Sequence, residues 1–166
     1  MSFTYAQLKN AIQDYTENTE TTFVNNLDIF IKNTEERILK IAQLEVFRKN
    51  KSGALTAYAT DPTNSKYLAL PSDYLAPYSL SFTTGGNKEF VMFKDVNFVQ
   101  SFNPDDGTSG APRYYAQFDI NNFILGPTPD AAYPVELHYF YRPQSLTAGA
   151  EDATTWLSTN ASVCML

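Results

Sequence analysis

The sequence predicts an α+β fold: an N-terminal amphipathic helical hairpin, then an antiparallel β-rich domain that contains one short helix. The period of the hydrophobic pattern changes along the 166 residues and supports this prediction. Apolar residues recur at helical intervals up to about residue 45 and then follow the alternation and turn signals of strands. We therefore expect a helical hairpin at residues 1–45, a β-rich domain at 46–150 and a truncated C-terminal segment at 151–166.

The first helix is predicted to begin after Thr4, because Thr4 and Gln7 have the spacing of a capping box. Its apolar residues at helical spacing are Tyr5, Leu8, Ile12 and Tyr15. The stretch "TENTETT" at 16–22 then supplies hydroxyl and amide side chains, which favour caps and turns.

A longer second helix follows, and one face of it is predicted to be apolar. This face comprises Phe23, Leu27, Phe30, Ile31, Thr34, Ile38, Ile41 and Ala42. Charged residues are predicted to lie largely off it, namely Glu35, Glu36, Arg37 and Lys40. The first helix is too short to cover the whole face, so another surface must cover the rest.

The β-rich domain is predicted to open with the extended stretch "VFRKNKSGALTAYAT" (46–60) and a strand in 66–75 that ends at Pro71. "YSLSFTTGGNKEFVMF" (78–93) is the clearest hairpin, since two β-rich runs flank Gly85, Gly86 and Asn87. "KDVNFVQSF" (94–102) suits a short helix with Val96, Val99 and Phe102 turned inward.

Residues 113–118, 122–126 and 134–141 are predicted to form a three-stranded meander. In the last strand Val135, Leu137, Tyr139 and Tyr141 share one face, and Glu136, His138, Phe140 and Arg142 share the other. One apolar and one mixed face indicate a half-exposed antiparallel sheet. Near the end of the chain, Ser158, Thr159 and Asn160 are good N-cap residues, so we expect a helix to begin there.

Composition excludes several classes of function. The chain has 12 Lys and Arg against 18 Asp and Glu, a net charge of −6, which argues against nucleic-acid binding as its main task. No apolar run approaches the length needed to cross a bilayer, and the N-terminus lacks the pattern of a signal peptide. The single Cys164 fits a reducing compartment.

Candidate catalytic and binding groups are few. His138 is the only histidine, and we interpret it as a structural or surface residue of a strand. Asp105 and Asp106 lack the alternating spacing of a calcium loop and are interpreted as a solvated turn. The basic "FRKNK" (47–51) is interpreted as a solvated junction between helix and sheet. We therefore predict no catalytic residue, no cofactor and no metal.

The aromatic residues of the C-terminal half allow two interpretations. They are Tyr114, Tyr115, Phe118, Phe123, Tyr133, Tyr139, Phe140 and Tyr141. They could form a platform on which sugar rings stack, or they could be cross-strand pairs and core with a surplus at protein interfaces. We favour core and interface.

The order of these parts resembles the head-to-tail adaptor (connector) proteins of short-tailed, podovirus-like bacteriophages. The phrases that carry the resemblance are "FVNNLDIFIKNTEERIL" (23–39), "YLALPSDYLAPYSL" (67–80), "KDVNFVQSF" (94–102) and "GAPRYYAQFDINNFILGPTPDAAYPVELHYFYRP" (110–143). Together they cover roughly residues 4–160. In that family, further bundle helices follow the phrase near Trp156. This sequence lacks them, so we expect the C-terminal bundle helices to be missing and the chain to be truncated.

The resemblance implies a structural virion protein and not an enzyme. Family members form a ring, typically of twelve copies, that joins the portal protein to the tail tube or nozzle protein and extends the DNA channel. Genomic DNA would pass through without sequence-specific binding, no membrane would be involved, and the protein would be assembled in the host bacterial cytoplasm into the neck of the virion. Candidate interface residues are Phe23, Leu27, Phe30, Ile31, Ile38, Ile41, Tyr139 and Tyr141.

Two rival functions remain open from the sequence. A β-rich tail component that binds host surface glycan would use Tyr139 or Tyr141 for stacking. A small hydrolase would depend on His138.

Overall fold

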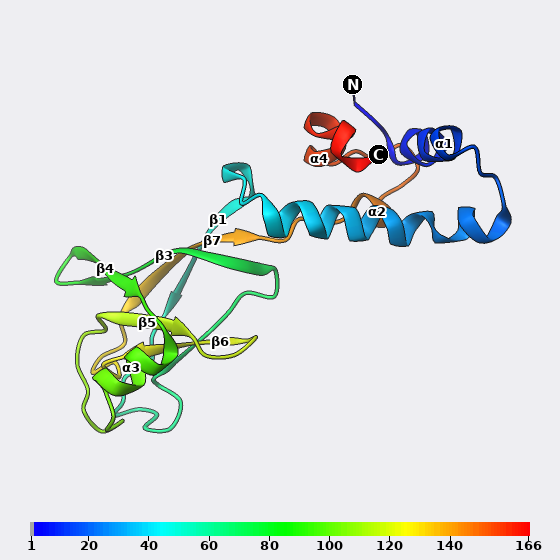
Figure 1. Cartoon of the computed structure of the whole chain (residues 1–166). Coiled ribbons are helices and arrows are strands. Elements are labelled where there is room, and N and C mark those ends of the chain that lie inside the picture. Colours follow the sequence, from blue (N-terminus) through cyan, green and yellow to red (C-terminus); the bar gives the residue numbers. More distant parts are fainter. Residues whose placement is uncertain (1) are drawn as a thin grey trace. The chain divides into compact units, whose positions relative to one another are not determined.

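The computed structural model describes residues 2–166 and confirms the α+β fold class. The chain folds as two compact units, one formed by the residues up to Leu44 together with Arg142–Leu166, the other by Glu45–Tyr141. The helices are α1 (Tyr5–Thr16), α2 (Thr21–Ile41), α3 (Val96–Phe102) and α4 (Trp156–Asn160). Figure 1 shows them with the strands, which are β1 (Arg48–Ala54), β2 (Tyr67–Ala69), β3 (Tyr74–Thr84), β4 (Asn87–Phe93), β5 (Tyr114–Gln117), β6 (Asn122–Gly126) and β7 (Pro134–Tyr141).

The helical unit begins with the predicted capping box. The Thr4 hydroxyl accepts a hydrogen bond from the Gln7 N–H at 3.2 Å, and the Gln7 side chain accepts one from the Thr4 N–H at 3.0 Å. Two of the N–H groups that a helix start leaves unpaired are thereby satisfied. Helix α1 ends at Glu17, which adopts a left-handed conformation with φ of 51°. The predicted start of the first helix after Thr4 is thus confirmed.

The buried face of α2 differs from the predicted one. Its buried residues are spaced four apart: Leu27, Ile31, Glu35 and Leu39. The prediction that Glu35 lies off the buried face is wrong. Its carboxylate accepts hydrogen bonds from the Ser145 hydroxyl and from the Leu146 N–H, the latter at 3.0 Å. These donors allow a carboxylate to be buried in the helical unit.

The C-terminal residues pack against the start of the chain. Backbone hydrogen bonds join the Phe3 N–H to the Ser158 carbonyl and the Tyr5 N–H to the Ala153 carbonyl, each at 3.0 Å. The short 3₁₀ turns at Leu146–Ala148 and Ser162–Met165 pack on α2 and bury Leu146 and Met165. Residues from the C-terminal part of the sequence therefore cover part of the apolar face of α2.

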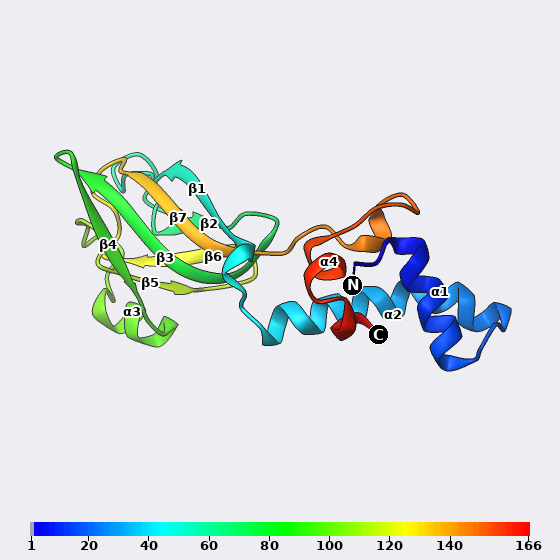
Figure 2. The same ribbon diagram turned by 90° about the horizontal axis from the view of Figure 1, so that it is seen from above.

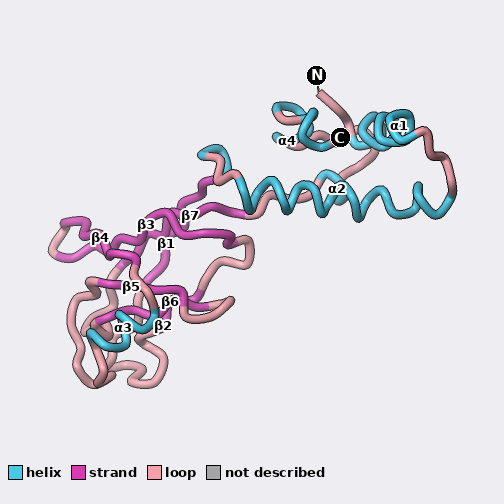
Figure 3. The backbone as a smooth tube through the Cα atoms, viewed as in Figure 1, coloured by secondary structure: helices cyan, strands magenta, loops and turns pink. Residues whose placement is uncertain are grey.

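The prediction that a helix begins at Ser158–Asn160 is wrong, because α4 already ends there. Thr155 is the N-cap of α4, and its hydroxyl accepts a hydrogen bond from the Ser158 N–H at 3.3 Å. The Ser158 hydroxyl in turn accepts one from the Thr155 N–H at 3.0 Å. This reciprocal pair fixes the helix start three residues earlier than the composition indicated. Figure 3 shows α4 among the short helical segments near the C-terminus.

The β unit is one curled seven-stranded sheet with the order β1-β7-β3-β4-β5-β6-β2. Two parts of the strand prediction need correction. First, the sheet is not purely antiparallel, since β4 and β5 pair in parallel through Met92↔Tyr114 and Phe93↔Tyr115. A parallel pair needs a crossover connection, and α3 with its flanking loops supplies it.

Second, residues 113–141 are not a meander. β5 pairs with β6 as predicted, but β7 lies between β1 and β3. The register places Leu137 opposite Leu80 and Val135 opposite Phe82, so the apolar face of β7 joins the apolar face of β3. Burial of these four side chains favours this arrangement over a sequential meander.

The predicted hairpin of β3 and β4 is confirmed. Gly85 and Gly86 form its two-residue turn with φ of 54° and 83°, values that favour glycine. The inner face of the curled sheet forms the core of the β unit. Its residues are Leu55, Leu80, Phe82, Val91, Tyr115, Phe123, Leu125, Val135, Leu137 and Tyr139.

Helix α3 lies against the other face of β5 and β6, as Figure 1 shows. Val99 is buried with Ala116 and Ile124. A Cβ atom at Gly126 would lie 2.9 Å from Val99 Cγ1, so this strand residue must be glycine for the helix to approach. The inward orientation predicted for Val99 is confirmed, whereas the one predicted for Phe102 is wrong, since this residue is 43% exposed.

Candidate interaction surfaces

The predicted interface residues of α2 separate into buried and exposed groups. Leu27 and Ile31 are buried in the helical unit, whereas Phe30 is 46% and Ile41 is 75% exposed. Phe23 and Ile38 are half-buried. Phe23, Phe30 and Ile41 are spaced by seven and eleven residues, which places them on one side of the helix. We name these three residues the exposed α2 stripe; the rings of Phe23 and Phe30 lie 5.9 Å apart.

The two predicted sheet residues are largely enclosed. Tyr139 is 3% exposed, and its hydroxyl donates a hydrogen bond to Asp73 Oδ1 at 2.8 Å. Burial, and next this hydrogen bond, raise the pKa of Tyr139 to about 12. Tyr141 is half-buried, with Lys49 Nζ 4.0 Å from its ring centroid. The face of Tyr139 is therefore not presented for stacking on a sugar.

An exposed aromatic cluster in the β unit was not singled out from the sequence. Phe98 and Phe102 of α3 each meet the ring of Tyr114 edge-on, with centroids 5.0 and 4.8 Å apart. Met92 is paired with Tyr114 in the sheet and is 54% exposed. We name Met92, Phe98, Phe102 and Tyr114 the α3 cluster. The i,i+4 spacing of the two phenylalanines, on a helix whose Val99 faces inward, was the signal that could have revealed it.

His138 lies on the outer face of the sheet among aromatic and charged side chains. Its ring meets Tyr78 edge-on with centroids 4.9 Å apart, and the Arg48 guanidinium lies 4.5 Å from the Tyr78 ring centroid. Beside it, hydrogen bonds from Lys88 and then Asn50 lower the pKa of the Glu136 carboxyl. These contacts describe a packed polar face. Ser79 lies opposite His138 in the pairing of β3 with β7, and within residues 2–166 no hydrogen bond joins the two side chains.

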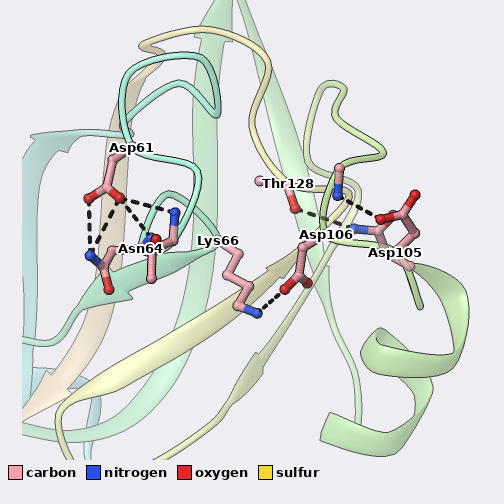
Figure 4. A network of polar contacts seen from close by, with 9 residues as sticks. Asp61, Asn64, Lys66, Asp105, Asp106 and Thr128 are labelled. Carbon is pink, nitrogen blue, oxygen red and sulfur yellow. Dashed lines mark hydrogen bonds and ion pairs between the residues drawn. The ribbon is translucent and has the colours of Figure 1, made fainter.

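The acidic loops near α3 are occupied by local hydrogen bonds and ion pairs (Figure 4). Asp105 Oδ1 accepts a hydrogen bond from the Gly107 N–H at 3.0 Å, while Asp106 pairs with Lys66. Asp61 accepts hydrogen bonds from Asn64, whose backbone N–H is the largest cause of the lowered pKa of the Asp61 carboxyl. Within residues 2–166 there is no group of three or more His, Cys, Asp or Glu side chains that could hold a metal ion.

The helices of the described chain, residues 2–166, include none with the length and hydropathy of a membrane span. Both units instead expose apolar side chains, the α2 stripe on one and the α3 cluster on the other. Exposed apolar patches of this kind are typical of proteins that act through contacts with other macromolecules.

The family model of the SU10 adaptor protein matches residues 3–163, and the chain belongs to this family. The family is one of phage head-tail adaptors, so the chain is a structural adaptor protein of a bacteriophage virion. It accordingly interacts with other virion components. A search among curated proteins gives no match.

Proposed function

We propose that this protein forms the head-to-tail adaptor ring that joins the portal vertex to the tail and extends the DNA channel of a short-tailed phage. The observation that carries the proposal is the family match over nearly the whole chain, residues 3–163. The partners are the portal protein on the head side, the tail tube or nozzle protein on the tail side, and further copies of the chain itself in a ring of twelve. Assembly takes place in the host cytoplasm.

The exposed α2 stripe is the surface that we assign to the portal or to neighbouring copies. It presents three large apolar side chains on one side of a 21-residue helix, and full burial of each such side chain contributes about 1.5–3 kcal/mol. Leu27 and Ile31 support this surface from within the helical unit. Each contact is modest, but a closed ring repeats it at every subunit, so the contacts add through symmetry.

The charge of the chain suits the wall of a DNA channel. With 12 Lys and Arg against 18 Asp and Glu, the chain carries a net charge of −6. Retention of DNA requires that Lys and Arg neutralise phosphates, and an acidic wall does not supply enough of them. Genomic DNA would therefore pass without being held and without its sequence being read.

The test replaces Phe30 by aspartate and measures incorporation into the portal complex. Portal protein of the same phage is mixed with wild-type chain, Phe30→Asp or Ile29→Asp, and the complexes are separated by sedimentation. Ile29 is a matched control, since it is also exposed (54%) on α2 but projects about 100° away from Phe30.

We expect Phe30→Asp to sediment mainly as free chain and Ile29→Asp to enter the complex as the wild type does. Circular dichroism should show that both variants remain folded, because both positions are exposed. Normal incorporation of Phe30→Asp would contradict the assignment of the stripe, and absence of any complex with the wild type would contradict the proposed ring.

A further inference from the structure

The two edge strands of the β unit, β1 and β2, line one shallow cavity although they are the first and last strands of the sheet order. Figure 2 shows them on the same side of the curled sheet. The cavity has a volume of about 70 Å³. It is bordered by Lys51, Ser52 and Gly53 of β1, by Leu68, Ala69 and Pro71 at β2, and by Val135 and Leu137 of β7. The curled sheet is therefore open between its edges, over an apolar floor.

The inner face of β1 is uncovered. Lys51 lies opposite Leu137 and Gly53 opposite Val135, so both positions are on the core face of the sheet. Val135 and Leu137 are buried, but every residue of β1 from Lys49 to Ala54 is exposed. Gly53 leaves open the space above Val135 that a side chain would occupy, as glycine does where another backbone approaches a strand.

The free edge of β1 carries unpaired backbone groups in a known register. Within residues 2–166 β1 pairs only with β7, and the Leu55 N–H continues this ladder with a hydrogen bond to the Tyr133 carbonyl at 2.8 Å. Since antiparallel residues alternate between inward and outward N–H and C=O groups, Asn50, Ser52 and Ala54 direct theirs to the open edge. Such an edge is a template for an added strand.

Charge selects the strand that can be added. Lysine side chains on an edge strand disfavour pairing with strands that carry no complementary charge. Lys49 is paired with Asp73, whereas within residues 2–166 Lys51 has no salt-bridge partner. An incoming strand with a carboxylate opposite Lys51 would neutralise it, and a small apolar side chain two residues away would reach the cavity beside Gly53.

We propose that β1 binds an extended acidic segment of another virion protein by strand addition. The main-chain groups of Ser52 provide the hydrogen bonds, Lys51 selects the carboxylate, and the cavity over Val135 and Leu137 receives an apolar side chain. This mode of recognition combines main-chain affinity with side-chain selectivity. It does not depend on ring formation through α2, so either proposal can fail while the other stands.

The test uses two labelled nine-residue peptides that alternate threonine with valine. In one, two valines are replaced by glutamate; in the other, the same two are replaced by lysine. Fluorescence polarisation measures binding, and amide hydrogen exchange reports protection of the β1 edge. Ser52→Pro removes one outward N–H without removing a hydrogen bond to β7, and Ser52→Ala is its control because it keeps that N–H.

We expect the acidic peptide to bind about five-fold more tightly than the basic one, and Lys51→Glu to reverse this preference. Ser52→Pro should weaken binding of the acidic peptide by about ten-fold, while Ser52→Ala binds as the wild type. Protection should appear at Ser52 and Ala54 only when the peptide is added. The reversal by Lys51→Glu tests the proposal independently of how the proline variant folds.

Three results would overturn the proposal. One is the absence of acidic-peptide binding at millimolar concentration. A second is equal binding of both peptides that Lys51→Glu leaves unchanged. The third is protection of the edge amides that rises with protein concentration alone, which would make a second copy of the chain the occupant.

Discussion

Replacement of Glu35 by alanine should destabilise the helical unit. Glu35 is 5% exposed, and its two carboxylate oxygens accept hydrogen bonds from the Ser145 hydroxyl and the Leu146 N–H. These hydrogen bonds connect Ser145 and Leu146, which follow β7 in the chain, to the middle of α2. In Glu35→Ala, both donors lose their acceptor, and the Leu146 N–H is left buried without it.

The magnitude follows from the two bonds. A hydrogen bond to a charged group contributes about 1.5–3 kcal/mol, and a buried donor left unsatisfied costs about 1–3 kcal/mol. The variant no longer buries a carboxylate, which offsets part of this loss. We expect Glu35→Ala to lower the free energy of unfolding by about 3 kcal/mol. Glu35→Gln should cost about 1 kcal/mol, because its carbonyl oxygen can still accept from the Leu146 N–H.

Urea denaturation followed by circular dichroism measures the loss, and hydrogen exchange of the Leu146 amide localises it. Glu36→Ala is the control, since Glu36 makes only a surface pair with Lys40 at 3.6 Å and should change stability by less than about 0.5 kcal/mol. Equal stability of Glu35→Ala and Glu36→Ala, with unchanged exchange at Leu146, would refute the reasoning.

Three further predictions concern packing, pH and the turn. Leu27 is fully buried, so Leu27→Ala should lower the free energy of unfolding by about 2–5 kcal/mol in urea denaturation, and a neutral effect would contradict the core described here. Burial opposes ionisation of Asp73, but hydrogen bonds from Lys49 and Tyr139 hold the pKa of its carboxyl below the usual value. Its contribution to stability is therefore present above about pH 4 and should be lost as the pH falls further, and Tyr139→Phe should reduce this loss in acid titrations followed by fluorescence. Gly86→Ala should cost about 1–2 kcal/mol in thermal unfolding, because alanine is strained at a φ of 83°.

The features that the sequence predicted correctly are those whose determinants lie within a few residues. Thr4 and Gln7 specify the start of α1, and Gly85 and Gly86 specify the hairpin of β3 and β4. In each case the hydrogen bonds or dihedral angles involve neighbours along the chain. Helix starts and tight turns of this kind can therefore be predicted from a few neighbouring residues.

The features that were missed depend on distant partners. The pattern of β7 showed a strand with one apolar face, but not that this face would meet Leu80 and Phe82 of β3. Likewise, Glu35 resembles any charged helix residue until Ser145, 110 positions away, is placed beside it. Hydrophobic periodicity shows which face of a helix or strand is apolar, but not which other element packs against that face. Strand order and buried polar contacts could therefore be seen only in the structure.

For the candidate interaction surfaces too, the sequence predicted local features but not contacts between distant residues. The sequence selected an apolar face of α2, but only the structure separates the exposed Phe30 and Ile41 from the buried Leu27 and Ile31. Tyr139, selected as an interface residue, lies in the core because β7 is a central strand. In the α3 cluster, the spacing of Phe98 and Phe102 was visible in the sequence, but the parallel pairing of β4 and β5 that brings Met92 beside Tyr114 was not.

The central claim is that the chain assembles as a ring on the portal, and the mass of that complex tests it most directly. Purified portal protein is titrated with the chain, and native mass spectrometry records the mass gained at saturation. The proposed ring predicts a single saturated species whose gain equals twelve times 18.6 kDa, with few partly filled complexes because closure is cooperative. A portal that gains no mass, or one that binds a statistical distribution of copies without a saturated state, would contradict the claim.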